Sequence, residues 1–133
     1  MQVISALFVE EFNMRQVDGP STRLDLTGVM FSLRAPTPPP VTIEPHLVAL
    51  IHCPPSESGS GVFEVIVTSD ADPESQAEQI ARNVSPFQVE PGKFTYRLVR
   101  AEITFDDLGT VYAHCRIDRG RWTTVPLSLL AAA

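Results

Sequence analysis

The chain has 133 residues, of which 44% are hydrophobic and 20% charged, and its formal net charge is −6. Those values are typical of one packed domain, so we expect a single domain over residues 1–133 and not a disordered chain. The negative charge disfavours nucleic-acid binding, which relies on basic surface, and also disfavours attraction to anionic membranes. Twelve prolines disfavour long helices and favour strands joined by loops.

The first residues do not resemble a targeting segment. No basic region precedes the apolar run, and Glu10 and Glu11 lie where a cleavage site would fall. No apolar run approaches the roughly 20 residues needed to span a bilayer. We therefore expect a cytoplasmic protein in which Cys53 and Cys115 stay reduced.

In the first third of the chain, residues 3–9 are apolar and predict a buried strand. Residues 13–20 end in Asp-Gly-Pro and predict a break with a turn. Residues 22–27 alternate and residues 29–33 are more apolar, which predicts two strand segments of a hairpin. Gly28 between them indicates a bulge or a close backbone approach.

Residues 35–40 read APTPPP and predict an extended, polyproline-like crossover, because proline has no amide hydrogen for a sheet. Residues 41–43 and 47–51 together predict a third strand. A flexible polar loop is expected at residues 56–61, and residues 62–68 predict a clear fourth strand.

The region from Asp70 to Asn83 allows two interpretations. Asp72 followed by proline and glutamate is typical of a helix start. Residues 80–84 alternate as a strand does. We favour a turn or a single helical turn near Pro73 with a strand from about Gln79, and a longer helix is the alternative.

The last third predicts several short strands, at residues 87–89, 94–105, 110–117 and 122–129, with a hairpin turn at 118–120. In total we expect seven to nine strands and at most one short helix. This pattern predicts a mostly β fold, an antiparallel two-sheet sandwich, with a closed barrel as the structural alternative.

Gly109 followed by Tyr112 resembles the tyrosine corner of an immunoglobulin-like domain, in which the tyrosine hydroxyl bonds upstream backbone. Cys53 and Cys115 are separated much as the paired cysteines of antibody domains are. The pattern departs in two places: Tyr112 stands three residues before Cys115, and no tryptophan follows Cys53 closely. The resemblance therefore implies an immunoglobulin-like architecture and not an antibody-type domain.

The chain as a whole resembles a group of small bacterial proteins that share a domain of unknown function. The likeness lies in the opening apolar strand and in short motifs: Asn13-x-Arg15 before Asp18-Gly19, Gly109-x-x-Tyr112, Asp118-x-Gly120 and Val125-Pro126-Leu127. It implies a β-sandwich in a bacterial cytosol. It supplies no catalytic residue.

We searched the sequence for a nucleophile and for a metal site. Ser58 and Ser60 lie in a Gly/Ser loop without the strand-to-helix turn of a nucleophile elbow. The pairs His52-Cys53 and His114-Cys115 offer four zinc-ligand types, but neighbouring residues on a strand point to opposite faces. We expect both cysteines in the core, unpaired, and both histidines facing outward or bonded locally.

Three further patterns have simpler structural interpretations. The acidic group Asp70, Asp72, Glu74 and Glu78 lacks the glycine and glutamate of an EF-hand and predicts a solvated loop. A small basic patch on an exposed hairpin comprises Arg116, Arg119 and Arg121 beside Trp122. Pro36 and Pro39 form a minimal PxxP motif, but Arg34 is out of the flanking register, which favours a rigid connection.

No credible reacting group, metal cage or phosphate-binding loop emerges, so we expect no enzyme and no cofactor. The sequence favours a non-catalytic protein-binding or assembly module, either a homo-oligomer or a subunit docked on a protein partner. The alternative is a small-molecule or metal-binding protein that uses the space between the sheets or around His52 and His114.

Overall fold

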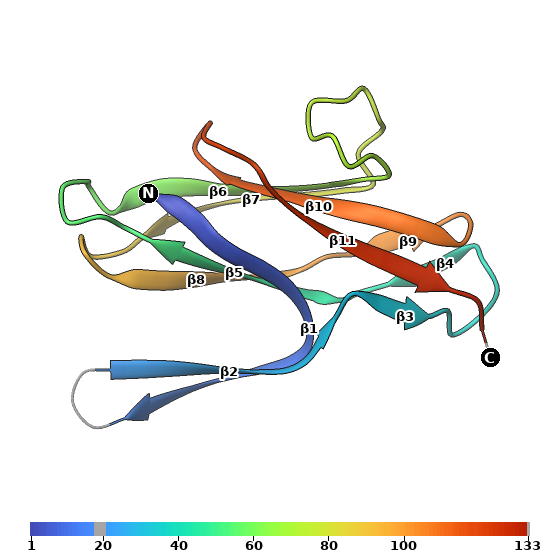
Figure 1. The fold of residues 1–133 in the computed structure, drawn as a ribbon, viewed down its shortest axis with the longest axis horizontal. Coiled ribbons are helices and arrows are strands. Elements are labelled where there is room, and N and C mark those ends of the chain that lie inside the picture. Colours follow the sequence, from blue (N-terminus) through green and yellow to red (C-terminus); the bar gives the residue numbers. More distant parts are fainter. Residues whose placement is uncertain (18–20, 133) are drawn as a thin grey trace.

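The computed structural model describes residues 1–17 and 21–132. These residues form eleven strands and no helix, so none of them belongs to a helix that could cross a membrane. The strands make two main sheets, of four and five strands, and a separate small pair (Figure 1). The prediction of an all-β protein with two main sheets is therefore confirmed, although the expected seven to nine strands are too few.

The four-stranded sheet is antiparallel throughout and has the order β2-β1-β5-β8. Its members are β1 (Gln2–Val17), β2 (Ser21–Met30), β5 (His46–His52) and β8 (Phe94–Arg100). The five-stranded sheet has the order β3-β11-β10-β6-β7. Its members are β3 (Ser32–Arg34), β11 (Thr123–Leu130), β10 (Gly109–Ile117), β6 (Ser60–Thr68) and β7 (Ala81–Gln88).

One pair in the five-stranded sheet is parallel, so the prediction of a purely antiparallel sandwich is wrong there. Short β3 lies alongside β11, with Leu33 opposite Leu129. The two strands are far apart in sequence, so no tight turn forces them to run in opposite directions.

The core fills the space between the two main sheets, and no strand ladder joins these sheets within the described residues, which rules out the closed barrel there. Side chains that alternate along the strands of both sheets supply the core. Those that are completely buried include Phe8, Leu47, Ile51, Phe63, Ala113 and Leu127. Arg97 of β8 closes one flank by donating from Nη2 to the Ser85 hydroxyl of β7 at 3.0 Å.

Two predicted strands are each split in the structure. The expected strand over 41–51 is divided between β4 (Val41–Ile43) and β5, and the one over 94–105 between β8 and β9 (Ile103–Phe105). The two breaks lie side by side in the structure, because the segments before and after them pair with each other: β4 with β9, and β5 with β8. Pro45, which has no amide hydrogen, lies at the break, and its carbonyl accepts a bond from the Ala101 amide.

The region from Asp70 to Asn83 forms a loop and then a strand, as the favoured interpretation states. A turn closes at Ser75, whose amide donates to the Asp72 carbonyl, and β7 starts at Ala81. The longer helix is wrong. The carboxylates of Asp70 and Asp72 accept the amides of Asp72 and Glu74, and such local bonds compete with helix formation.

The first hairpin departs most from expectation. The strand does not break at residue 13 but continues to Val17, and the predicted Asp18-Gly19-Pro20 turn lies outside the described residues. The expected bulge at Gly28 is also wrong, because β1 and β2 keep one register on both sides of it. Gly28 instead has a φ of 67°, and a Cβ there would come within 2.6 Å of the Glu10 side chain. The close approach at Gly28 is therefore between its backbone and the Glu10 side chain, and not between two backbones.

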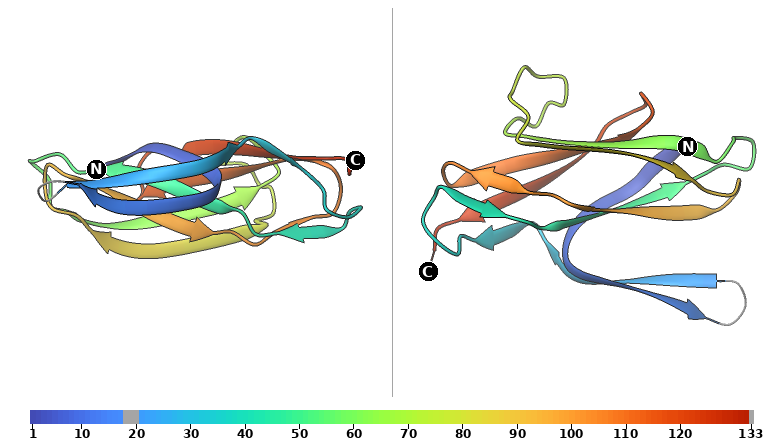
Figure 2. Two further views of the ribbon diagram at one scale, coloured as in Figure 1. Left: turned by 90° about the horizontal axis from the view of Figure 1, so that it is seen from below. Right: turned by 180° about the vertical axis from the view of Figure 1, so that it is seen from behind.

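We call residues 10–17 of β1 and 21–28 of β2 the hairpin arm. β5 pairs with β1 only as far as Val9, beyond which β1 pairs with β2 alone. The arm curves away from the sandwich and projects as a two-stranded ribbon, and the chain then returns to the body at β3 (Figures 1 and 2). None of its described residues belongs to the main core.

Candidate functional site

The hairpin arm has two chemically different faces. Residues directly opposite each other in an antiparallel pair share a face, and so do alternate residues of one strand. Phe12 lies opposite Leu26 and Met14 opposite Leu24, which makes one face apolar. The other face is polar and consists of Glu11, Asn13, Arg15, Arg23, Asp25 and Thr27.

The apolar face of the arm turns toward the outer face of the four-stranded sheet. The Phe12 ring lies 6.4 Å from the rings of both His46 and Tyr96. Val9 and Val48 lie outside the main core and are nevertheless 1% and 2% exposed. The base of the arm therefore packs on the sandwich, whereas Met14, farther out, is 52% exposed.

The polar face of the arm contains one ion pair and one like-charge pair. Arg15 donates from Nε to Asp25 at 2.8 Å. Arg15 also lies directly opposite Arg23, a cross-strand arrangement that is unfavourable. The Arg23 guanidinium reaches the carbonyl of its own neighbour Thr22, at 3.5 Å. Among the described residues of the arm, Arg23 therefore has no acidic partner.

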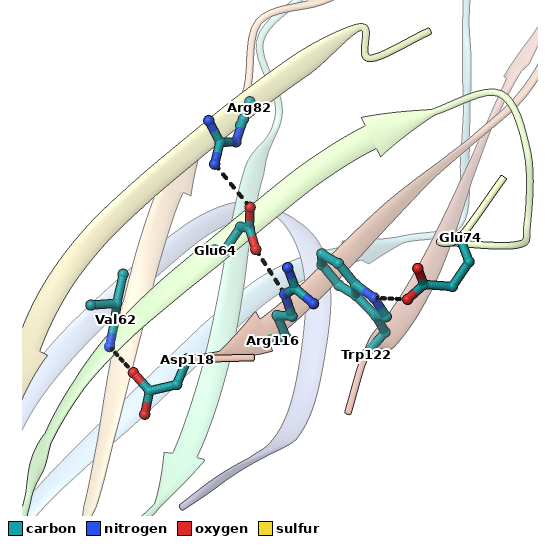
Figure 3. A network of polar contacts seen from close by, with 7 residues as sticks. All are labelled: Val62, Glu64, Glu74, Arg82, Arg116, Asp118 and Trp122. Carbon is teal, nitrogen blue, oxygen red and sulfur yellow. Dashed lines mark hydrogen bonds and ion pairs between the residues drawn. The ribbon is translucent and has the colours of Figure 1, made fainter. Parts of the chain in front are cut away.

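A second candidate site lies on the outer face of the five-stranded sheet (Figure 3). Glu64 of β6 accepts from Arg116 Nε at 2.7 Å and from Arg82 Nη2 at 3.1 Å. Burial alone raises the pKa of the Glu64 carboxyl, but the hydrogen bonds from both arginines outweigh it and the pKa lies below its ordinary value. The Arg116 guanidinium stacks 4.0 Å from the Trp122 ring centre.

This network fastens the loop before β7 to the sheet. The Trp122 indole donates from Nε1 to Glu74 at 2.9 Å, and His114 Nε2 lies 3.0 Å from the Asp70 carbonyl. Since a carbonyl only accepts, Nε2 carries the imidazole hydrogen, and Nδ1 accepts from the Thr124 hydroxyl at 2.8 Å. His114 is fully buried, and this burial lowers its pKa although the Asp70 carbonyl and nearby carboxylates oppose the shift.

The two His-Cys pairs do not form one site. His52 ends β5 and His114 lies in β10, in different sheets. Cys53 and Cys115 are both buried and free, and burial raises the pKa of the Cys115 thiol to about 12. Among the described residues, no three His, Cys, Asp or Glu side chains are placed to hold a metal ion.

The remaining sequence candidates fall in separate places. Ser58 lies between β5 and β6, where its carbonyl accepts from the Cys53 thiol, and Ser60 is the first residue of β6. Pro36 and Pro39 lie in the connection between β3 and β4, after Arg34. Of the acidic group, Asp70, Asp72 and Glu74 take part in the loop contacts above, whereas Glu78 lines an open groove.

One of the three arginines of the predicted basic patch is neutralised. Arg116 is engaged by Glu64 and Trp122, and only Arg119 and Arg121 remain exposed. Tyr112 stacks on His114, with ring centres 6.5 Å apart, on the opposite face of β10 from Cys115. The described residues show no hydrogen bond from its hydroxyl of the tyrosine-corner type.

An open groove runs between the β7 end of one sheet and β9. It has a volume of about 480 Å³ and is lined by Glu78, Ile80, Thr104, Asp106 and Asp107, among others. Such a volume falls in the range of small-ligand sites. Its walls combine exposed acids with apolar side chains, and among the described residues no buried side-chain nitrogen or oxygen is left without a hydrogen-bond partner.

Comparison with models of known protein families gives no match for this chain, and comparison with curated proteins gives none either. The resemblance to the small bacterial proteins named above therefore stays a prediction. The sequence interpretation missed the hairpin arm. The expected N-terminal hairpin itself is confirmed, and what the sequence interpretation lacks is the continuation of its first strand through residues 10–17. A signal for it is present, because Phe12 and Met14 before Asp-Gly-Pro mirror Leu24 and Leu26 after it.

Proposed function

We propose that the protein is a non-catalytic protein-binding or assembly module whose contact surface is the hairpin arm. The observation that carries the proposal is an amphipathic ribbon that lies outside the core and keeps half of Met14 exposed. A two-stranded ribbon is only marginally stable in water by itself. A partner that covered its apolar face and paired with its edge would stabilise it.

The cellular setting belongs to the same proposal. Buried, free Cys53 and Cys115 are compatible with a reducing compartment, and we place the protein in the bacterial cytoplasm. The net charge of −6 supports a protein partner or a second copy over nucleic acid or a membrane.

We also infer that the sandwich is immunoglobulin-like. What supports this is strand order: β11-β10-β6-β7 follows the G-F-C-C′ order of a variable-type sheet, and β1-β5-β8 follows the A-B-E order. The hairpin arm is then an insertion after the first strand. NMR contacts that placed β6 beside β5 instead of β10 would contradict this inference.

The test of the proposed function uses a short-arm variant, in which Asn-Gly replaces residues 14–24. Asn13 and Asp25 then flank a two-residue turn suited to a hairpin, and Phe12 and Leu26 keep their place on the sandwich. The matched control is Leu108→Asp, which removes another exposed apolar side chain far from the arm.

Affinity capture with each version as bait, and native mass spectrometry of each purified protein, give the readout. We expect the wild type and Leu108→Asp to associate with a protein partner or with a second copy, and the short-arm variant to lose that association. The same partners and the same mass for all three versions would refute the proposal.

A second candidate, small-molecule binding, is supported by the groove of about 480 Å³ beside β9. Its test is an NMR screen of small ligands in which chemical-shift changes at Ile80 and Thr104 are followed. Changes confined to other parts of the chain would count against the groove.

A further inference from the structure

We propose that the partner of the hairpin arm is a second copy of this chain, and that the free edges of the two β2 strands pair antiparallel about Leu24. This inference rests on the proposed function and specifies its partner. β2 is the outermost strand of the four-stranded sheet, so its outer backbone groups have no ladder partner among the described residues. Such an edge is a template for another strand.

The symmetry of the pairing limits the possible registers. A two-fold axis that relates two antiparallel strands of one sheet stands perpendicular to that sheet, so it keeps each face of the arm on the same side. Directly opposite residues must therefore come from the same face. This condition is met only when one residue, the centre of the pairing, lies directly opposite its own copy across the axis. The available centres along the middle of β2 are Arg23, Leu24, Asp25 and Leu26.

The charges of β2 select one of these centres. An axis through Leu24 places Arg23 of each copy opposite Asp25 of the other, which gives two ion pairs. An axis through Arg23 or through Asp25 places like charges opposite each other, which is destabilising. An axis through Leu26 puts Asp25 opposite Thr27 and leaves Arg23 without an acid. Only the Leu24 centre makes the strand complementary to itself.

The pairing about Leu24 also offsets the repulsion between Arg15 and Arg23 within the arm. Arg23 lies opposite Arg15 and has no acidic partner among the arm residues that the structure describes. In the dimer, Asp25 would lie between Arg15 of its own copy and Arg23 of the other, so the like-charge pair would gain a shared counter-ion. The two Leu24 side chains would meet on the apolar face and lengthen it.

The other edge strands fit a two-fold pairing less well. β7 contains Pro86, which interrupts an edge, and β3 spans only three residues. The charged side chains of β8 are Arg97 and Arg100, so its self-pairing offers no acid. Among the outermost strands of the described sheets, β2 alone carries charges of both signs. The side of β1 that is free beyond Val9 also carries both signs, but its one cation, Arg15, is already paired with Asp25.

Disulfide trapping tests the register directly. In the proposed dimer the two Leu24 Cα atoms lie about 4.5–5.5 Å apart, within the range that a disulfide spans. We expect Leu24→Cys to form a covalent dimer under mild oxidation. Leu26→Cys, the matched control on the same face, should not, because its own copy lies four residues away along the strand. Native Cys53 and Cys115 are fully buried and do not compete.

Charge reversal tests the ion pairs by sedimentation at concentrations from about 1 µM to about 1 mM. Arg23→Asp places one acid opposite each Asp25 of the dimer and should raise the dimer dissociation constant at least about tenfold. The same change puts an acid opposite Arg15, so the arm itself is not weakened. Exchanging the two residues, with Arg23→Asp and Asp25→Arg together, should restore the dimer.

Each other outcome overturns the proposal. Cross-linking at Leu26→Cys but not at Leu24→Cys would refute the register, and an unchanged dissociation constant for Arg23→Asp would refute the ion pairs. The wild type could also stay monomeric and capture a different protein that the short-arm variant fails to capture. This result would refute the second copy as partner and leave the proposed function intact. No arm-dependent partner of any kind would refute both.

Discussion

His114 is a buried imidazole that Asp70, Thr124 and Thr68 hold in one tautomer, with the Thr68 hydroxyl 3.1 Å from Nε2. Its Nε2 hydrogen points at the Asp70 carbonyl, and its Nδ1 accepts from Thr124. Burial favours the neutral form and lowers the pKa, whereas an unfolded chain protonates the same ring near pH 6.5. The folded state therefore binds fewer protons than the unfolded state just below that pH.

This difference predicts a loss of stability on acidification. As the pH falls below about 6.5, the unfolded chain takes up a proton that folded His114 resists, so the free energy of unfolding decreases until the folded pKa is reached. Urea unfolding at pH 8, 7, 6 and 5.5 measures the effect, and the His114→Gln variant should show a flatter profile. Equal profiles for the two proteins would contradict the assignment.

Glu64 responds to acid in a lower range. Its pKa lies below the ordinary value of 4.5, so its two arginine contacts persist until the pH falls through that lowered value. The effects of His114 and Glu64 are therefore separated along the pH axis.

At the scale of elements, the loop before β7 depends on side chains from other strands. Glu74 is held by Trp122, and Asp70 is held by His114. The loop has no helix or strand of its own between Ser69 and Ile80. Its order therefore comes from these contacts and from its internal turns.

Replacing Trp122 with phenylalanine removes the indole donor to Glu74. We expect amide hydrogen exchange in residues 72–78 to accelerate roughly fivefold, the equivalent of one ordinary hydrogen bond of about 1 kcal/mol. Mass spectrometry of exchanged peptides measures the change. Glu74→Gln keeps an acceptor oxygen and should exchange nearly as the wild type does. Unaltered exchange in Trp122→Phe would show that the loop is held by other contacts.

Sequence patterns predicted elements well where the local signal and the tertiary contacts agreed. β6 and β10 were expected almost to the residue, because their inward side chains alternate with outward ones. The splits at Pro45 and Ala101 are not evident from the sequence, because strand-forming residues lie on both sides of each break and only the pairing assigns them to two different sheets. The parallel β3 was missed for the same reason.

The candidate site was harder to predict than the fold. The turn residues at 13–20 indicate a break more strongly than the alternation of Phe12 and Met14 indicates a strand, so local sequence does not predict the arm. The contacts that join Glu64, Arg82 and Arg116 connect three strands, and no spacing in the sequence indicates them.

For the whole molecule, the main core and the hairpin arm are separate structural units. The fully buried side chains come from strands of the sandwich, and the described arm residues contribute none to the main core. The short-arm variant should therefore fold. It keeps Phe12 and Leu26, and we expect its free energy of unfolding to change by no more than about 1 kcal/mol.

Circular dichroism and urea unfolding of the short-arm variant measure this expectation. The variant should keep a β-type spectrum and a single cooperative transition. A variant that is unfolded, or that loses several kcal/mol, would show that the arm is part of the folding unit.

Because the chain returns to the body at β3 after the arm, the arm and the body can evolve separately. Glu10 and Gly28 stand opposite each other where the arm leaves the body, and a ribbon of another length or charge pattern could be attached there without altering a buried residue. Selection on recognition would then act on one short stretch and selection on folding on the rest. Under the proposed function, grafting the arm onto an unrelated sandwich is expected to transfer the choice of partner, and replacing it with a different ribbon to exchange it.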